Sequence, residues 1–339
     1  MYGALLNPGC RFFDPRLGQS TTLTGRVIAR HMAAKVNEVI AGEYDHVGKA
    51  IIYGDTDSAY FSAHPILKNE IESGDIDWSK ENQIMYYDEV CKIVNDSFPD
   101  FMKTAHNSPQ DFGRIIAAGR EIVGETGIFI KKKRYAILVF DDEGNRVDVD
   151  GKPGKIKALG LDLRRSDTPA FMQDFLSEVL LMALTKVPEK TIIDRIREFR
   201  GEFNAKPSWE KGTPKRVNNL TNHTTKYKKT GKCGVGHALA AINYNNLLDM
   251  YSDQYSVRIT DGMKTIVCKL KDNQLKMTSI GIPTDEKRIP SWYKDLPFDD
   301  AAMEEAIITK KIENLLGVMN WDLKSAETKS NFNDLFDFS

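Results

Sequence analysis

The hexapeptide YGDTDS at residues 53–58 decides how the fold and the chemistry of this 339-residue chain are interpreted. The apolar residues before it, 50–53, and after it, 59–61, predict two short β-strands. Gly54 supplies backbone freedom for a turn between them. We therefore expect the two carboxylates, Asp55 and Asp57, to lie together at the tip of a hairpin.

Two carboxylates on a rigid hairpin indicate a site for a divalent metal. Carboxylate oxygens are hard ligands that suit Mg²⁺, which keeps several waters and is often completed by substrate phosphates. Asp55 and Asp57 are therefore candidate metal ligands and catalytic residues for phosphoryl chemistry. The hexapeptide alone leaves a plainer alternative open, because Asp and Gly favour turns whatever the function.

Length and composition describe a globular protein with room for two domains, since 41% of the residues are hydrophobic and 28% are charged. The chain has 47 basic and 48 acidic residues, so any surface that binds nucleic acid has to be local. The four cysteines form no CxxC pair and favour reduced thiols. With no signal peptide and no membrane-spanning apolar run, we expect a cytoplasmic protein.

The hexapeptide and its surroundings resemble the family B DNA polymerases, above all the replicative polymerases of tailed bacteriophages. In that family a YGDTDS hairpin of the palm domain binds the catalytic metals. The resemblance implies Asp57 and Asp55 as catalytic ligands of two Mg²⁺ ions, with Mn²⁺ as an alternative, and places Thr56 at the nucleotide. It also implies an α+β fold, in which a palm with an antiparallel β-sheet and packed helices precedes a mostly helical thumb.

The likeness covers nearly the whole chain and implies four parts. Residues 1–10 correspond to a remnant of the fingers motif, 11–160 to the C-terminal portion of the palm, 161–325 to a DNA-binding thumb, and 326–339 to a clamp-binding tail. Within the palm, apolar residues at helical spacing predict a helix over 21–40 that stops at Gly42 and packs behind the hairpin.

Residues 1–5, MYGAL, are similar to the second half of the family's fingers motif KxxxNSxYG. Only Tyr2 and Gly3 can be carried over, as nucleotide-site residues. The motif's lysine and the DxxSLYPS motif, which supplies the first palm Asp, have no counterpart. Two metals and a triphosphate need a third strong carboxylate. We expect a split enzyme whose N-terminal partner chain carries the exonuclease, that Asp and most of the fingers; a truncated or fragmentary gene is the alternative.

A basic cluster followed by an apolar segment predicts contact with DNA near the active site. Lys132, Lys133, Arg134 and Tyr135 resemble the family's KxY motif, whose side chains touch the primer–template duplex near the 3′ end. Minor-groove acceptors are nearly the same for every base pair, so a lysine there does not demand a sequence. Glu121, upstream of this cluster, matches a glutamate that lies near the metals in related polymerases. It is a candidate accessory ligand or a plain surface acid.

Residues 206–232 contain eight basic side chains and one acidic one. Such a segment supplies affinity for phosphates that is independent of sequence and weakens with salt, as a thumb that grips the duplex requires. A flexible solvated loop is the alternative. The predicted DNA-binding side chains here are Lys215, Arg216, Lys226, Lys228 and Lys229.

The end of the chain sets four large apolar residues in a short polar tail: Phe332, Leu335, Phe336 and Phe338. Apolar anchors of this kind insert into grooves on partner proteins. The tail resembles the sliding-clamp-binding peptide of the phage polymerases, and a tail that docks on its own thumb is the alternative.

These features predict the C-terminal subunit of a split DNA-directed DNA polymerase. It would add dNTPs to a primer 3′-OH by two-metal nucleotidyl transfer on primer–template DNA, only with its N-terminal partner, in the host cytoplasm if a phage encodes it. A catalytically incomplete subunit that binds DNA and tethers the sliding clamp is the rival. Another metal-dependent nucleotidyl cyclase or transferase would lack the KKRY-like strand and the clamp-like tail.

Overall fold

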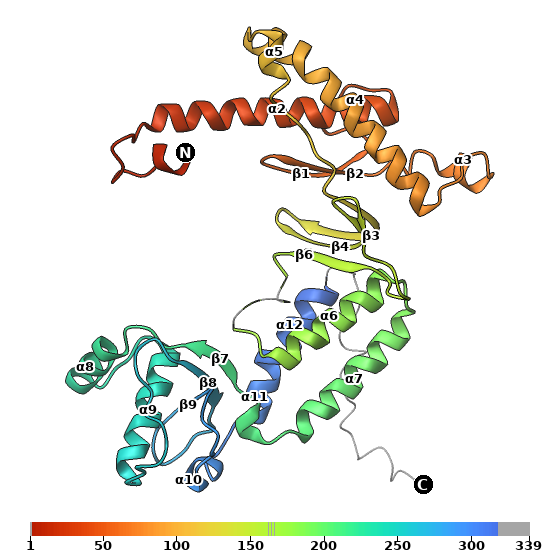
Figure 1. Cartoon of the computed structure of the whole chain (residues 1–339). Coiled ribbons are helices and arrows are strands. Elements are labelled where there is room, and N and C mark those ends of the chain that lie inside the picture. Colours follow the sequence, from red (N-terminus) through yellow and green to blue (C-terminus); the bar gives the residue numbers. More distant parts are fainter. Residues whose placement is uncertain (1, 162, 164, 166, 318–339) are drawn as a thin grey trace, which may run out of the picture. The chain divides into compact units, whose positions relative to one another are not determined.

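The computed structural model describes residues 2–161, 163, 165 and 167–317, and the chain divides into two compact units between Gly160 and Leu161. Each unit combines helices with antiparallel strands (Figure 1), so the predicted α+β fold class is confirmed. The tail residues predicted to bind a clamp lie outside the described residues. No helix of the described part is long and apolar enough to cross a membrane.

Two long helices dominate the N-terminal unit. Helix α2 (Pro15–Ala41) begins where the Asp14 side chain accepts the Arg16 amide and ends at Gly42, which adopts a left-handed φ of 78°. The helix predicted over 21–40 is therefore confirmed, and it starts earlier because Pro15 suits the first turn. The other helices of the unit are α1 (Tyr2–Leu5), α3 (Lys68–Glu72), α4 (Lys80–His106) and α5 (Gln110–Gly113).

Helices α2 and α4 pack together and cover a two-stranded antiparallel hairpin of β1 (Ile51–Asp55) and β2 (Ser58–Phe61). The buried side chains between them include Val36 and Ile40 from α2 and Val90, Val94 and Phe98 from α4. The predicted hairpin and the helix behind it are thus both present. Their shared apolar core holds the hairpin against the helices.

A second antiparallel sheet completes this unit, with β4 at its centre. Residues 135–141 of β4 are all buried, which explains why the segment reads as one continuous apolar run and does not alternate. The strands are β3 (Ile122–Lys131), β4 (Arg134–Asp142), β5 (Asn145–Arg146) and β6 (Lys155–Leu159).

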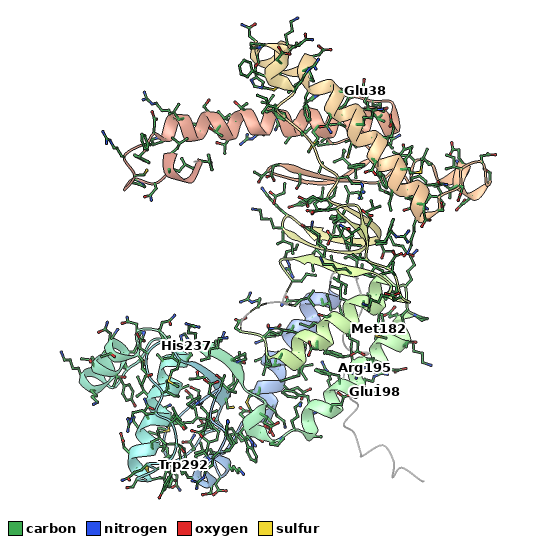
Figure 2. All side chains as sticks on the ribbon, viewed as in Figure 1. Glu38, Met182, Arg195, Glu198, His237 and Trp292 are labelled. Atoms are coloured by element: carbon green, nitrogen blue, oxygen red, sulfur yellow. The ribbon has the colours of Figure 1, made fainter. Side chains whose placement is uncertain are left out.

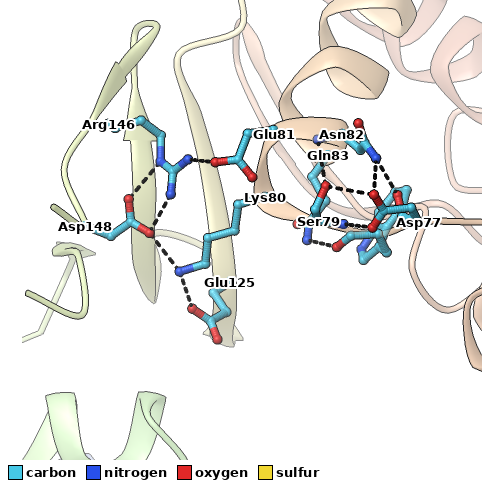
Figure 3. Close-up of polar contacts among 10 residues, drawn as sticks. Asp77, Ser79, Lys80, Glu81, Asn82, Gln83, Glu125, Arg146 and Asp148 are labelled. Carbon is cyan, nitrogen blue, oxygen red and sulfur yellow. Dashed lines mark hydrogen bonds and ion pairs between the residues drawn. The ribbon is translucent and has the colours of Figure 1, made fainter. Parts of the chain in front are cut away.

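Ion pairs around one nearly buried carboxylate, that of Asp148, join α4 to this sheet. The Asp148 carboxylate, 5% exposed, lies 2.8 Å from both Arg146 Nε and Lys80 Nζ, and Glu125 contacts Lys80 from the other side (Figure 3). Hydrogen bonds from Arg146 and then Lys80 hold the pKa of Asp148 far below its usual range. The start of α4 is therefore tied to the sheet by a carboxylate that stays ionised.

The C-terminal unit contains a helical part and an inserted mixed module. In the helical part, the ring of Phe175 stacks on Phe199 with centroids 3.6 Å apart. Its elements are α6 (Ala170–Leu184), α7 (Glu189–Ala205), α11 (Asp300–Glu304), the π-helical turn η3 (Glu305–Thr309) and α12 (Lys310–Leu316).

The module inserted between α7 and α11 has a three-stranded antiparallel sheet in the order β7-β8-β9, with α9 packed on β9. Figure 2 shows His237 at the start of α9, and Trp292 in α10. This sheet was not predicted, because its strands are short and carry no clear alternation. The module consists of η2 (Ser208–Glu210), β7 (Thr213–Arg216), α8 (Leu220–Thr230), α9 (Gly236–Met250), β8 (Lys264–Lys269), β9 (Ser279–Pro283) and α10 (Ser291–Lys294).

Candidate metal and nucleic-acid site

The hairpin tip that carries the two aspartates is a tight, strained turn. Asp55 pairs with Ser58, so Thr56 and Asp57 make the turn, and the Asp57 amide donates to Asp55 O at 2.6 Å. Thr56 has a φ of 48°, which is unusual for a β-branched residue. The expectation that Gly54 makes the turn was wrong, because Gly54 pairs with Ala59 within the ladder. Backbone strain of this kind clusters at functional sites.

The Asp55 carboxylate is 20% exposed and has two polar neighbours. The Thr56 hydroxyl donates to Asp55 Oδ1 at 3.2 Å, and the Lys133 ammonium lies 3.7 Å from Asp55 Oδ2. The Lys133 ammonium is therefore a cation that already lies beside Asp55, and positive charge is favourable at this carboxylate. Hard carboxylate oxygens at an open turn also fit Mg²⁺, which accepts few protein ligands and keeps its waters.

Asp57 is exposed and borders a cavity of about 550 Å³ that Glu121 also lines. Glu121 is 68% exposed and forms an ion pair with Lys157 at 2.9 Å. Across the described residues, no three His, Cys, Asp or Glu side chains are grouped to hold a metal ion. The structure therefore places Asp57 and Glu121 on one cavity without completing a ligand set.

The turn between β3 and β4 meets the hairpin of the aspartates. Lys132 and Lys133 form this turn, and both side chains are exposed. The Lys133 amide donates to the Tyr53 hydroxyl at 2.8 Å, and Lys133 has a φ of 61°. On the other side, a Cβ on Gly160 would lie 2.1 Å from the Lys133 carbonyl oxygen. The predicted DNA-contacting lysines and the predicted metal ligands are thus held next to each other.

Four aromatic rings fill the space behind the two turns: Tyr53, Tyr60, Phe129 and Tyr135. The hydroxyls of Tyr60 and Tyr135 lie 2.7 Å apart. Burial, followed by this hydrogen bond, raises the pKa of Tyr60 well above its ordinary value, so its hydroxyl stays protonated. Tyr135 is only 7% exposed, so its ring packs inside the unit while Lys132 and Lys133 project outward. Arg134, beside it, is half-buried.

Helix α8 presents the basic segment of the C-terminal unit. Lys226, Lys228 and Lys229 are exposed on it, and the helix contains no acidic residue. Its start is anchored by the Leu220 amide, which donates to Asp261 Oδ1 at 2.8 Å. Two of the lysines lie in the last turn, where they also interact favourably with the helix dipole.

The end of β7 extends this basic surface. Arg216 is exposed and directly opposite Lys264 of β8. Like charges that face each other across two strands repel, and an anion bound there would relieve the repulsion. Sequence reasoning missed Lys264 because it is an isolated lysine far from the basic segment. Lys215 is part of the same strand and pairs with Asp167 at 3.0 Å.

One basic residue of the segment 206–232 does not belong to this surface. Lys211 is 2% exposed; its ammonium donates to Asn204 O at 3.1 Å and lies 3.2 Å from the Asp300 carboxylate. It therefore joins η2 to α7 and α11 inside the unit, and its inclusion in a phosphate-binding segment was wrong.

The predicted nucleotide-site residues Tyr2 and Gly3 lie in α1, which packs against the start of α2 (Figure 1). Tyr2 is 44% exposed, and a Cβ on Gly3 would meet no atom within 4 Å. Their role at a nucleotide stays a prediction.

No protein-family model matches the chain. It is similar to the DNA-directed DNA polymerase of Escherichia phage RB69, with 27% identity over 361 residues that cover 100% of this chain and 37% of that protein. It is also 26% identical, over 293 residues, to the DNA-directed DNA polymerase of Enterobacteria phage T4, covering 80% of this chain and 30% of that protein.

A shorter stretch of 59 residues is 46% identical to DNA polymerase II of Escherichia coli (strain K12), covering 17% of this chain and 6% of that protein. The chain therefore spans about a third of the length of the two phage polymerases, 37% and 30%. These similarities support a DNA polymerase.

Proposed function

We propose that this chain is the C-terminal subunit of a split DNA-directed DNA polymerase, formed by the distal palm and the thumb. Its reaction would be the template-directed addition of dNTPs to a primer 3′-OH. The observation that carries the proposal is the junction of two turns: the aspartate turn at 55–58 and the lysine turn at 132–133 are joined through Lys133, which contacts both Tyr53 and Asp55. The similarity to two phage DNA polymerases supports it.

The carboxylates of Asp57 and Asp55 would hold the catalytic ions, two Mg²⁺ or Mn²⁺. Bound there, such ions would lower the pKa of the primer hydroxyl and neutralise the triphosphate. The strained turn at Thr56 fixes the two carboxylates before substrate binds, and Thr56, Tyr2 and Gly3 are the proposed nucleotide contacts. Glu121, which lines the same cavity as Asp57, is the proposed accessory ligand.

A third strong carboxylate is proposed to come from an N-terminal partner chain, together with the exonuclease and the fingers. Two considerations support this. The hairpin tip supplies two acids, and the candidate third acid, Glu121, is engaged with Lys157. In addition, roughly two thirds of each phage relative has no counterpart in this chain, since the coverage is 37% and 30%. A sliding clamp bound through Phe332, Leu335, Phe336 and Phe338 is the second proposed partner.

The proposed DNA contacts are independent of base sequence. Near the active site they are Lys132, Lys133 and Arg134, with Tyr135 holding the turn from behind. On the C-terminal unit they are Lys215, Arg216, Lys226, Lys228 and Lys229, together with Lys264. Lysine and arginine contacts to phosphates supply affinity that falls with salt, which suits an enzyme that copies any template.

Primer extension tests the catalytic assignment. The chain is mixed with the part of the phage RB69 polymerase that has no counterpart in it, made as a separate polypeptide. The Asp57→Ala variant is mixed with the same polypeptide, and the rates of nucleotide incorporation are compared. We expect Asp57→Ala to lose at least about 1000-fold in incorporation rate, or about 4 kcal/mol of transition-state stabilisation, with DNA affinity within about twofold of wild type.

Glu143→Ala is the matched control, because Glu143, like Asp57, is an exposed acid at the turn of a β-hairpin. It should extend primers normally. Extension by Asp57→Ala at the wild-type rate would show that the catalytic assignment is wrong. A wild-type pair that binds primer–template but adds no nucleotide would favour the rival, a DNA-binding subunit that tethers the clamp.

A further inference from the structure

One carboxylate of the C-terminal unit, that of Asp167, collects cations from two separate segments. It lies just ahead of α6, and the ammonium of Lys215 in strand β7 lies 3.0 Å from its Oδ2. Arg165 Nε donates to Asp167 Oδ1 at 3.0 Å, and Arg165 Nη2 donates to Oδ2 at 3.2 Å. The carboxylate therefore joins the turn before α6 to the inserted module by charge-assisted hydrogen bonds.

The carboxylate and the Lys215 ammonium are both presented by backbone with its own contacts. The Gln173 side-chain amide donates to Arg165 O at 2.9 Å and closes the turn that carries Asp167. Lys215 lies opposite Thr265 in the pairing of β7 with β8, and the Thr265 hydroxyl donates to Lys215 O at 3.2 Å. The two charged groups thus meet because two held segments of backbone bring them together.

The Asp167 carboxylate is ionised and can be reached from solvent. Hydrogen bonds from Arg165 and then from Lys215 hold the pKa of Asp167 far below its usual range. The three side chains are 28% exposed at Asp167, 36% at Lys215 and 61% at Arg165. A phosphate also offers paired anionic oxygens, so it can compete with the carboxylate for the same cations.

Lys215 belongs to a region of positive charge. Arg216 follows it in the chain and lies opposite Lys264. Burial, and then the charge of Lys215, lowers the pKa of His237, so Lys215 also lies near the start of α9. Asp167 is thus an acid beside cations that the proposed function assigns to DNA, and its negative charge offsets part of their attraction for a polyanion.

We infer that Asp167 is an internal competitor of the DNA backbone. In the DNA-free protein its carboxylate holds Lys215, and a phosphate of the duplex displaces the carboxylate when DNA binds. Taking the displacing anion to be a DNA phosphate rests on the proposed function.

The competition sets how firmly the duplex is held. A lysine that is paired with Asp167 for most of the time is available to DNA for the remaining fraction, and the apparent affinity falls by that fraction. A partly exposed ion pair of this kind lowers affinity by up to about fivefold. Such a competitor loosens the grip without removing it, which suits an enzyme that shifts along its template after each addition.

Fluorescence anisotropy with a labelled DNA duplex tests the competition without measuring synthesis. Wild type is compared with Asp167→Asn, which keeps the shape of the side chain and removes its charge. Asp167→Asn should bind the duplex about fivefold more tightly. Its slope of log Kd against log salt should steepen by up to about 0.9, because one more cation is then available to a phosphate. Affinity that is unchanged or lower than that of wild type would overturn the inference.

Asp249→Asn is the matched control for net charge. Asp249 is an acid of the same unit that forms an ion pair with Arg258, so its replacement makes the same change in charge and also breaks a pair. It should bind the duplex within about twofold of wild type, as should Asp167→Glu, which keeps the charge. An equal gain in affinity for Asp167→Asn and Asp249→Asn would assign the effect to net charge and overturn the inference.

A double-mutant cycle shows whether Asp167 acts through Lys215. Lys215→Met should weaken duplex binding at least about threefold more in the Asp167→Asn background than in wild type, because Asp167 then no longer holds the ammonium. Circular dichroism checks that all four proteins are folded. Equal losses in the two backgrounds would also overturn the inference.

The outcome can be separated from that of the proposed function by adding the primer-extension assay. Tighter binding by Asp167→Asn without any synthesis by the wild-type pair would keep the competitor and refute the polymerase. Synthesis by the wild-type pair with equal duplex binding by wild type and Asp167→Asn would do the reverse. A chain that binds no duplex in either form would overturn both.

Discussion

Single residues with unusual backbone conformations mark both turns of the candidate site. Thr56 and Lys133 have φ values of 48° and 61°, although neither is glycine. Each conformation costs on the order of 1–3 kcal/mol and persists only where the surroundings impose it. Here the Tyr53 hydroxyl holds the Lys133 amide, and Gly160 packs against the Lys133 carbonyl. The site is therefore rigid because its residues constrain one another.

Gly160→Ala should disturb the lysine turn. Gly160 has a φ of 67°, and its new Cβ would lie 2.1 Å from the Lys133 carbonyl oxygen, so backbone has to move. Gly151→Ala is the control, since Gly151 has a φ of 74° but an added Cβ there meets no atom within 4 Å. We expect Gly160→Ala to cost about 2 kcal/mol more than Gly151→Ala, measured by hydrogen exchange of β4 amides. Equal costs would contradict the packing argument.

Asp141 and Asp142 offer a second comparison between adjacent residues. Asp141 is 1% exposed; it accepts a charge-assisted hydrogen bond from Arg120 and another from the Gly144 amide. Asp142 pairs with Lys155 at the surface. Asp141→Asn should cost about 3 kcal/mol because it weakens a buried ion pair, and Asp142→Asn less than about 1 kcal/mol. Hydrogen exchange of the β4 amides measures the loss of stability in each variant. Similar losses in the two variants would show that burial of the carboxylate does not set its contribution to stability.

At the scale of elements, His31 joins the two long helices. Its Nε2 lies 2.9 Å from Ser97 Oγ of α4, and its Nδ1 lies 2.7 Å from the Tyr44 hydroxyl. Ser97 donates its own proton to Val94 O at 2.6 Å, so Nε2 is the donor and Nδ1 accepts from Tyr44. This arrangement requires a neutral imidazole. Burial, and then the charge of Lys35, lowers the pKa of His31.

The packing of α2 on α4 should therefore weaken in acid. Because the pKa of His31 is lower in the folded state, the stability that neutral His31 contributes is fully present above its unfolded pKa of about 6.5. This contribution falls as the pH drops toward the folded pKa, by up to about 1.4 kcal/mol per pH unit. Hydrogen exchange of α4 amides between pH 7.5 and 5.5, corrected for intrinsic rates, measures the loss. His31→Gln should remove this component of the pH dependence, and a slope unchanged in that variant would assign it to other groups.

At the scale of the whole molecule, the charges nearly cancel, with a formal net charge of −1, so affinity for DNA has to come from local surfaces. Replacing Lys226, Lys228 and Lys229 of α8 together with Ala should weaken duplex binding and lower the slope of log Kd against log salt by up to about 2.7. Fluorescence anisotropy at several salt concentrations measures this change.

The matched control replaces three exposed lysines elsewhere in the same unit: Lys271, Lys276 and Lys287. The first two lie between the end of β8 and the start of β9, whereas α8 is anchored near the start of β8. This variant has the same change in net charge. A salt slope that falls equally in both variants would show that overall charge, and not the surface of α8, binds the DNA.

The sequence by itself determined the features that depend on neighbouring residues, namely the helix that ends at Gly42 and the hairpin of YGDTDS, whereas the α+β class was implied by the resemblance to a known family. Capping, apolar spacing and strand propensity act over a few residues, so they can be seen in the chain. The prediction that Gly54 makes the turn was wrong, because turn propensity alone does not set the register of the two strands. Tertiary structure alone decided that Lys133 meets Asp55, that Arg216 faces Lys264, that Lys211 and Tyr135 are buried, and that β2 and β3 line one cavity. These contacts join segments far apart in the chain, and long-range packing has no local signature.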